Sequence, residues 1–302
     1  GIDLLRASRV YAPSSIRVLT SAYINEDAII DAINECEIYC YILNPFDPVD
    51  LQQTIWQSLL MRKKMVENKN ILQNVKQLLF GTIQAISDAL DEKDQYTNGH
   101  SRRVTLYAEI IGKEMNLNED KLEKLRLAGL LHDIGKIGTP ESILNKPGKL
   151  TDEEFVIIKN HPSRGADIVR SLTQLGEAID WIKHHHERYD GRGYPSNLVG
   201  EEIPLEAAIL AVADTYDAMT SDRSYRKGLP HKVALEEIQR CAGTQFNPQV
   251  AEAFVKVEKL IEKELIRCRF SDTNYTTSKL LNILEPQAVV VESVPLKEKL
   301  CS

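Results

Sequence analysis

Histidine and aspartate residues gather in the middle of this 302-residue sequence, and their side chains suit a metal centre. Six of the seven histidines lie between residues 100 and 186, and His132 is followed directly by Asp133. Imidazole and carboxylate groups together favour iron, manganese or zinc over calcium or magnesium. A lone histidine or a lone histidine–aspartate pair is usually structural, so the metal hypothesis depends on the whole assembly.

The candidate ligands stand at the edges of apolar, helical segments. His132 and Asp133 end the apolar stretch 125–131, and Asp214 follows the apolar run 207–213, where an unpaired carboxylate would be costly. Further histidines also follow helical segments: His161, His184, His185 and His186. A metal is a natural partner for polar groups at the edge of a core. Two metals that share a carboxylate form a known device for phosphoester hydrolysis, and helical bundles can hold such centres.

The elements that must position these residues are predicted to be helices. Residues 76–262 have an almost wholly helical pattern, and glycine and proline gather at 138–148 and 191–204, which we predict to be loops. A long amphipathic helix is expected from Pro48, with a connecting segment at 61–75. Its imperfect heptads favour a homodimer through this helix, and the alternative is one surface helix that runs into the next domain.

Residues 1–60 alternate between strand and helix patterns. We predict strands at 16–20 and 39–43 with a helix at 27–37 between them, as in a parallel sheet with crossover helices. Two strands are too few for an independent sheet. The sequence begins with Gly1 rather than methionine, so we expect a fragment or a trimmed chain.

Composition and charge exclude several classes of protein. A net charge of −7 argues against a general nucleic-acid binder, which needs a basic face. No apolar run approaches the roughly 20 residues that cross a bilayer, and no signal peptide is visible, so we expect no membrane association. The five cysteines are odd in number and scattered, which favours a reducing cytoplasm over a disulfide framework.

The motifs of the central region occur in one order along the chain. They are Tyr96-Thr97-Asn98-Gly99-His100-Ser101, His132-Asp133-Ile134-Gly135-Lys136, His161, His185-His186-Glu187 with Gly191-Arg192-Gly193-Tyr194-Pro195, and Asp214 with Asp217-Ala218-Met219-Thr220. In this set and order the sequence resembles the HD-GYP family. The resemblance implies a mainly α fold, in which an HD-type helical bundle at 76–262 is a phosphodiesterase that hydrolyses cyclic di-GMP to pGpG and possibly GMP.

The same resemblance assigns roles to individual residues. One metal would be held by His100, His132, Asp133 and Asp214. The second would be held by His161, His185 and His186, with Asp133 shared between the two and acting in catalysis. Lys136, Arg223 and Arg226 would bind the phosphates, Lys136 also acting in catalysis, and Tyr194 would contact the substrate. The Gly193-Tyr194-Pro195 loop would also contact diguanylate cyclase domains.

The resemblance also predicts two divalent ions, with iron or manganese favoured. Some family members carry a glutamate four residues before the first histidine and bind three metals, but here that position is Tyr96. A phenol is a poor substitute for a carboxylate toward such metals. His184 and His231 are interpreted as exposed or hydrogen-bonded side chains rather than ligands.

The amino-terminal region 1–60 resembles the second half of a response-regulator receiver domain. Thr20 matches the switch hydroxyl and Tyr41 the switch aromatic, but Asn44 replaces the usual lysine before proline. The part with the phospho-acceptor aspartate is absent from this chain. We therefore predict a partial receiver-like α/β region in a two-component system, joined by the long helix to the catalytic domain and followed by a carboxyl-terminal extension at 263–302.

Two alternatives to the cyclic di-GMP phosphodiesterase stay open. The first is the same chemistry on another cyclic dinucleotide, because base recognition depends on the shape of the pocket. The second is a catalytically silent sensor or docking protein that acts through the Gly-Tyr-Pro loop. The complete ligand set argues against the silent protein, because nothing would then require so many buried polar groups.

Overall fold

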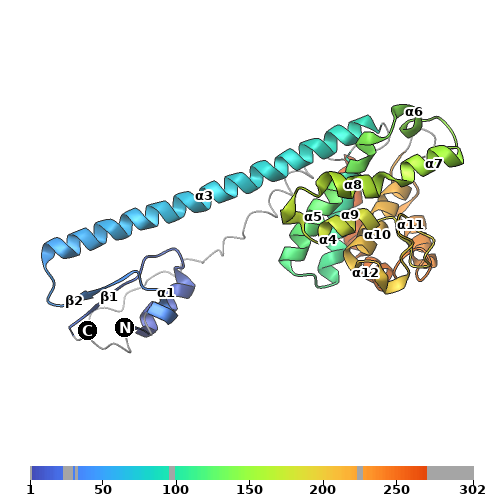
Figure 1. Cartoon of the computed structure of the whole chain (residues 1–302). Coiled ribbons are helices and arrows are strands. Elements are labelled where there is room, and N and C mark those ends of the chain that lie inside the picture. The colour runs from blue at the N-terminus through green and yellow to red at the C-terminus, as the bar shows by residue number, and fades with distance from the viewer. Residues whose placement is uncertain (1, 23–29, 31–32, 95–98, 223–226, 271–302) are drawn as a thin grey trace. The chain divides into compact units, whose positions relative to one another are not determined.

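A computed structural model describes residues 2–22, 30, 33–94, 99–222 and 227–270 of the chain (Figure 1). Its mainly helical fold confirms the predicted class. The chain divides into two compact units, with the boundary between Gln77 and Leu78. Several residues of the predictions lie outside the described ranges: Tyr96, Arg223, Arg226, 27–29 and 31–32 of the helix at 27–37, and most of the extension at 263–302.

The amino-terminal unit contains helix α1 (Ile2–Tyr11) and two short strands, β1 (Val18–Ser21) and β2 (Cys40–Leu43). The strands pair in parallel, with Val18 opposite Cys40 and Ser21 opposite Leu43, as the alternating pattern predicts. This two-stranded sheet does not support the predicted receiver-like domain. The strand residues are all partly or fully exposed, so the described part of this unit lacks the buried sheet of a doubly wound domain.

Helix α3 (Pro48–Lys93) is the long helix that the sequence predicts, and it begins at the predicted proline. The Asp47 carboxylate accepts a hydrogen bond from the Val49 amide at 2.7 Å and so satisfies a free donor at the start of the helix. No proline interrupts the following 45 residues, and Gly81 is tolerated inside the helix. The helix therefore extends well beyond the expected connector at 61–75.

The second unit is a bundle of helices that begins within α3. Its long helices are α4 (His100–Glu114), α5 (Glu119–Leu131), α10 (Leu205–Thr220), α11 (His231–Arg240) and α13 (Glu258–Phe270). Its shorter elements are η1 (Ile134–Gly138), α6 (Glu141–Leu144), α7 (Asp152–Lys159), α8 (His161–Val169), η2 (Thr173–Leu175), α9 (Ala178–His184), η3 (Gly200–Glu202) and α12 (Pro248–Lys256).

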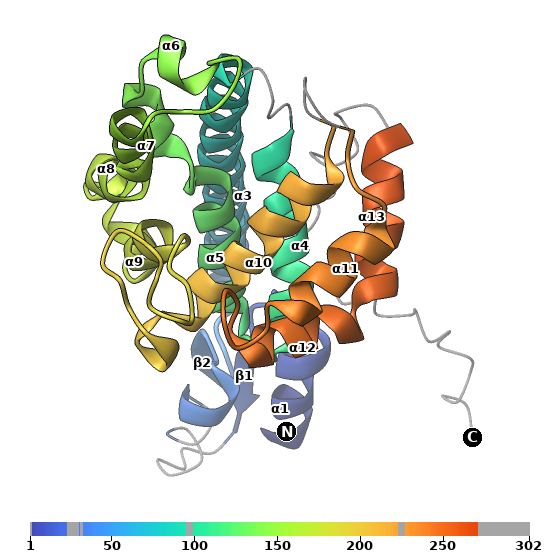
Figure 2. The same ribbon diagram turned by 90° about the vertical axis from the view of Figure 1, so that its right-hand side faces the viewer.

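Helix α4 is the centre of this bundle and packs against α5 and α10 (Figure 2). Helix α9 packs against α5, α8 and α10, and α8 packs against η1. The packed faces bury aliphatic and aromatic side chains that form one core, which includes Tyr107, Ile111, Leu125, Leu130, Trp181, Ile182, Ile209, Tyr216 and Phe254. Among the helices of the described residues, none combines the length and apolar character that a bilayer crossing requires.

Candidate metal centre

Helix ends deliver the predicted ligands. His100 is the first residue of α4, and His161 is the first residue of α8. His132 follows α5 directly, and Asp133 precedes η1. The remaining candidates are His185 and His186, which follow α9, and Asp214, which lies within α10. The tight packing of α4, α5, α8, α9 and α10 brings all these positions to one place in the unit.

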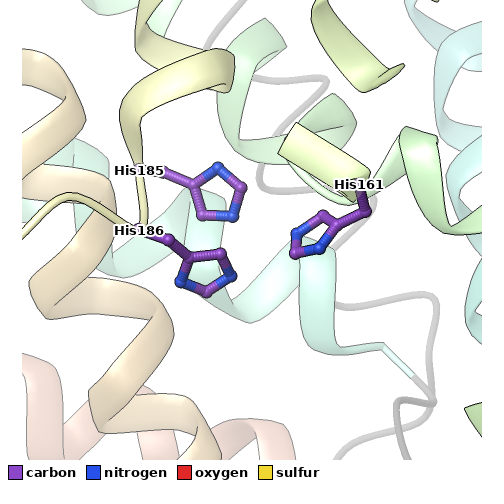
Figure 3. Close-up of side chains that lie close together, drawn as sticks. All are labelled: His161, His185 and His186. Carbon is purple, nitrogen blue, oxygen red and sulfur yellow. The ribbon is translucent and has the colours of Figure 1, made fainter. Parts of the chain in front are cut away.

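Three groups of three candidate ligands form in this place, and two of them share no residue. The third, His132, Asp133 and His185, takes one histidine from each of the other two. The side chains of His161, His185 and His186 point toward one another, with ligand atoms within 4.8 Å (Figure 3). The second group lies within the same limit and consists of His100, His132 and Asp214. Apart from Asp133, these groups bring together the residues that the sequence resemblance assigns to the two metals.

Asp133 lies between the two groups. Its Oδ1 is 3.1 Å from His161 Nε2, and its Oδ2 is 3.5 Å from His132 Nε2. Each carboxylate oxygen therefore faces a different group. A carboxylate in this position can contact two cations at once.

Gly135 explains why α8 comes close enough to bring His161 to Asp133. A Cβ atom at Gly135 would overlap the backbone carbonyl of His161 and crowd the amide of Gly165. Any side chain at this position would separate η1 from α8. The glycine two residues after Asp133 thus has a packing role in the geometry of the site.

Backbone carbonyls fix the orientation of three histidine rings. The Nδ1 atoms of His132, His161 and His185 lie 2.7–2.8 Å from the carbonyl oxygens of Gly129, Ile158 and Ile182, each three residues earlier. This contact leaves Nε2 as the free nitrogen of each ring. All three Nε2 atoms are buried without a hydrogen-bond partner among the described residues. Buried nitrogens with no partner are costly, and a metal ion would satisfy them, so the residues fit such a group.

The protonation states also suit cation binding. Burial lowers the pKa of His132 and of His185, and it lowers the pKa of His186 to about 3. Burial alone would raise the pKa of Asp133, but Lys136 and the neighbouring histidines hold it well below its usual value. Neutral imidazoles beside an ionised carboxylate are the forms that bind metals.

His100 differs from these rings. Burial alone would lower its pKa, but hydrogen bonds to Asp214 and Asp217 raise it to about 10. Its Nε2 lies 3.2 Å from Asp214 Oδ1, and its Nδ1 lies 2.8 Å from Asp217 Oδ2. Nδ1 therefore faces a carboxylate in place of a backbone carbonyl.

Two of the predicted substrate-binding residues lie at the edge of the site. Lys136 Nζ is 2.7 Å from Asp133 Oδ2. The Tyr194 ring lies 4.9 Å from the His186 ring, measured between centroids. Glu187 orders the loop that carries Tyr194, since its buried carboxylate accepts hydrogen bonds from the amides of Ser196 and Leu198 at 2.6 and 3.2 Å.

The two histidines outside the predicted ligand set make other contacts. His184 Nε2 lies 3.2 Å from Ser196 Oγ. His231 lies between the Tyr216 hydroxyl at 2.8 Å and a carboxylate oxygen of Glu258 at 3.2 Å. Sequence reasoning missed a role for Asp217, which contacts His100. The three-residue spacing between Asp214 and Asp217 was the available signal, because it places both on one face of a helix.

Comparisons with known proteins identify the family of this chain. The family model described as an HD domain matches residues 84–250. A cyclic di-GMP phosphodiesterase of Thermotoga maritima is 33% identical across 91% of this chain and 80% of its own length. The cyclic di-GMP phosphodiesterase response regulator RpfG of Xanthomonas campestris is 30% identical across 85% of this chain and 72% of its own length.

A solved structure shows the same fold. The crystal structure of a cyclic GMP-AMP specific phosphodiesterase of Vibrio cholerae superposes with a TM-score of 0.50 at 24% identity. The match covers 66% of this chain and 52% of that one. The family match, the two relatives and the histidine–aspartate and Gly-Tyr-Pro motifs agree, and the chain therefore belongs to the HD domain family as an HD-GYP member.

Proposed function

We propose that this chain hydrolyses cyclic di-GMP in a reaction that depends on two divalent metal ions, giving linear pGpG and, after a second cleavage, GMP. The observation that carries the proposal is the position of Asp133, whose two carboxylate oxygens face two separate groups of candidate ligands. The two relatives named as cyclic di-GMP phosphodiesterases support the substrate class.

The residues present would hold the ions in two neighbouring sets. One ion would bind His100, His132 and Asp214, the other would bind His161, His185 and His186, and Asp133 would contact both. Iron or manganese suits a set of imidazoles with two carboxylates. When bound, such ions would polarise the phosphoryl oxygens and lower the pKa of the attacking water.

The chain's own residues would then position the substrate and balance charge. Lys136 would hold Asp133 in its ionised form and neutralise negative charge on a phosphoryl oxygen. Tyr194 would contact the substrate beside His186. Arg223 and Arg226, which lie outside the described residues, would add phosphate contacts. Contact of the Gly193-Tyr194-Pro195 loop with diguanylate cyclase domains stays a prediction from the sequence.

The first experiment compares hydrolysis of cyclic di-GMP by protein loaded anaerobically with Fe(II) or Mn(II). Asp133→Ala should abolish turnover, because it removes the carboxylate whose two oxygens face the two groups. Asp167→Ala is the matched control, since Asp167 is an exposed carboxylate on α8 that pairs with Arg170, and it should keep wild-type activity.

Different negative results in this experiment would contradict different parts of the proposal. No turnover with either metal, despite two bound ions per chain, would overturn the substrate assignment. Hydrolysis of cyclic GMP-AMP in the same sample would then indicate another cyclic dinucleotide. Tight binding of cyclic di-GMP with no hydrolysis of any substrate would indicate a sensor.

We also propose that α3 forms a homodimer. Exposed apolar side chains recur along it with the spacing of a heptad seam: Met61, Met65, Leu72, Val75 and Leu79, which are 42–60% exposed. Asn68 takes the remaining core position between Met65 and Leu72. A second copy would cover the seam.

The dimer can be tested with charges on the seam. Leu72→Glu with Val75→Glu should convert a dimer to a monomer, measured by light scattering after size-exclusion chromatography. Asn70→Glu with Gln77→Glu places the same charges on the opposite face of α3 and should leave the mass unchanged. A wild-type monomer at tens of micromolar would contradict the proposal.

A further inference from the structure

His100 is oriented by a side chain, whereas three other histidines of the site are oriented by the backbone carbonyl three residues earlier. Its Nδ1 lies 2.8 Å from Asp217 Oδ2. His100 is the first residue of α4, and Asp217 lies on α10. The ring therefore depends on a partner from α10 for its orientation.

Asp217 is itself held in place from two sides. Arg103 donates from Nε to Asp217 Oδ1 at 2.7 Å and from a terminal nitrogen to Oδ2 at 3.0 Å. The Ser221 hydroxyl donates to Oδ2 at 3.2 Å. Only 1% of the Asp217 side chain is exposed. A two-pronged contact with an arginine fixes both the position and the plane of a carboxylate.

The contacts of His100 with Asp214 and Asp217 follow from the spacing of residues on α4 and α10. On α4, Arg103 follows His100 by three residues, and on α10, Asp217 follows Asp214 by three residues. Residues three apart share one face of a helix. His100 therefore meets Asp214 through Nε2 and Asp217 through Nδ1, so that one helix offers both a candidate ligand and the support for another.

We infer that Asp217 is a positioning residue for the proposed metal centre, which with Arg103 holds His100 so that Nε2 faces Asp214, where the ion shared with His132 and Asp214 would bind. The inference rests on the proposed function, since it presupposes that His100 binds a metal. A carboxylate behind a metal-binding imidazole fixes its tautomer and increases its basicity. Because the positive charge of Arg103 balances the negative charge of Asp217, Asp217 can orient the His100 ring without adding net negative charge to the centre.

A purely structural ion pair on the same helix offers the matched comparison. Glu109 is buried on α4 and accepts a hydrogen bond from Arg126 at 3.2 Å. Like Asp217, it is a buried carboxylate with an arginine partner, but within the described part of the chain its contacts are with Arg126 and Lys113 and not with a candidate ligand. Loss of Glu109 should therefore affect folding without a specific effect on metal binding.

The test measures Mn(II) binding by the full chain in competition with a chelator, together with thermal unfolding in excess EDTA. Asp217→Ala should weaken the binding of one of the two ions by about 10–100-fold and leave the other ion unchanged. Asp217→Asn keeps an acceptor for Nδ1 and should lie between wild type and Asp217→Ala. Glu109→Gln should lower the melting temperature without a change in affinity for either ion.

The outcomes separate this inference from the proposed function. A wild-type chain that binds no Mn(II) would overturn the proposed centre itself. Two wild-type binding steps that stay unchanged in Asp217→Ala would overturn the inference alone, and so would an equal loss of both ions. If Asp217→Ala does not fold, Asp217→Asn and Arg103→Gln supply the same comparison, and unchanged affinities in both would again reject the inference.

Discussion

Lys136 follows Asp133 by three residues, and its Nζ lies 2.7 Å from Asp133 Oδ2. The same Nζ lies 3.5 Å from Asp94 Oδ2. Burial alone would lower the pKa of Lys136, but the Asp133 and Asp94 carboxylates raise it above its usual value. The lysine is therefore a cation throughout the physiological range. Its charge stabilises the ionised form of Asp133 at the point where the two groups of candidate ligands meet.

Replacement of this cation should impair turnover more than metal binding. Lys136→Met keeps most of the aliphatic volume but removes the charge, and kcat should fall about 10²–10³-fold, as for loss of one preorganised charge stabiliser. Metal content should stay at the wild-type value. Lys121→Met is the control, because Lys121 pairs with Glu206 outside the site and should leave kcat unchanged. Equal kcat values in both variants would reject the role of Lys136.

One group of candidate ligands can be removed without the other. His161→Ala deletes a member of the group with His185 and His186, so bound manganese should fall from two ions per chain to one. Metal analysis of the gel-filtered protein measures this directly. His184→Ala is the control, since His184 contacts Ser196 rather than the site, and two ions should remain. Two ions in His161→Ala would contradict the assignment.

Gly135 should tolerate no side chain. Gly135→Ala would push η1 away from α8, because the new Cβ would overlap the His161 carbonyl. We expect at least a tenfold loss of activity and a clear loss of stability. Gly81→Ala is the matched control, since a Cβ there meets nothing within 4 Å and alanine favours a helix by about 0.5–1 kcal/mol. Normal activity of Gly135→Ala would show that the close approach is dispensable.

The Glu109 ion pair predicts a pH-dependent stability. Burial alone would raise the pKa of Glu109, but hydrogen bonds from Arg126 and Lys113 lower it below its usual value of 4.5. A carboxylate with a lowered pKa in the folded state contributes stability above pH 4.5, and this contribution is lost as the pH falls through the folded value. Glu109→Gln should therefore cost about 3 kcal/mol at pH 7, and the cost should shrink below pH 4.5.

Urea unfolding of wild type and Glu109→Gln at pH 7, 5 and 4 measures this difference. Glu237→Gln is the control, because Glu237 is an exposed carboxylate whose pair with Arg240 should contribute little. A difference between wild type and Glu109→Gln that grows toward low pH would contradict the sign of the effect.

The sequence pattern predicted which helices and strands form, but it did not predict where they end. Pro48 marked the start of α3, yet the helix continues to Lys93 because no helix-breaking residue intervenes. The strands at 16–20 and 39–43 were found one or two residues later, as Val18–Ser21 and Cys40–Leu43. The predicted receiver-like domain is not supported, since resemblance of short segments does not supply the further strands that a buried sheet requires.

The sequence by itself determined the type of centre. Histidines and aspartates at the ends of apolar helices predicted a metal centre, and the resemblance of the motifs to the HD-GYP family implied the ligand candidates and their division into two sets. Their number and position along the chain limit the chemistry that they can perform. The sequence can determine these features, because they depend only on residue types and on their spacing along the chain.

Only the tertiary structure decided which partners orient these ligands. Asp217 and His100 are 117 residues apart in the chain, and their contact depends on the packing of α10 against α4. The close packing of α8 against Gly135 likewise depends on contact between the backbones of α8 and η1. Such contacts arise when separate helices pack their faces together, and the spacing of residues along one helix does not specify which face of another helix it will meet.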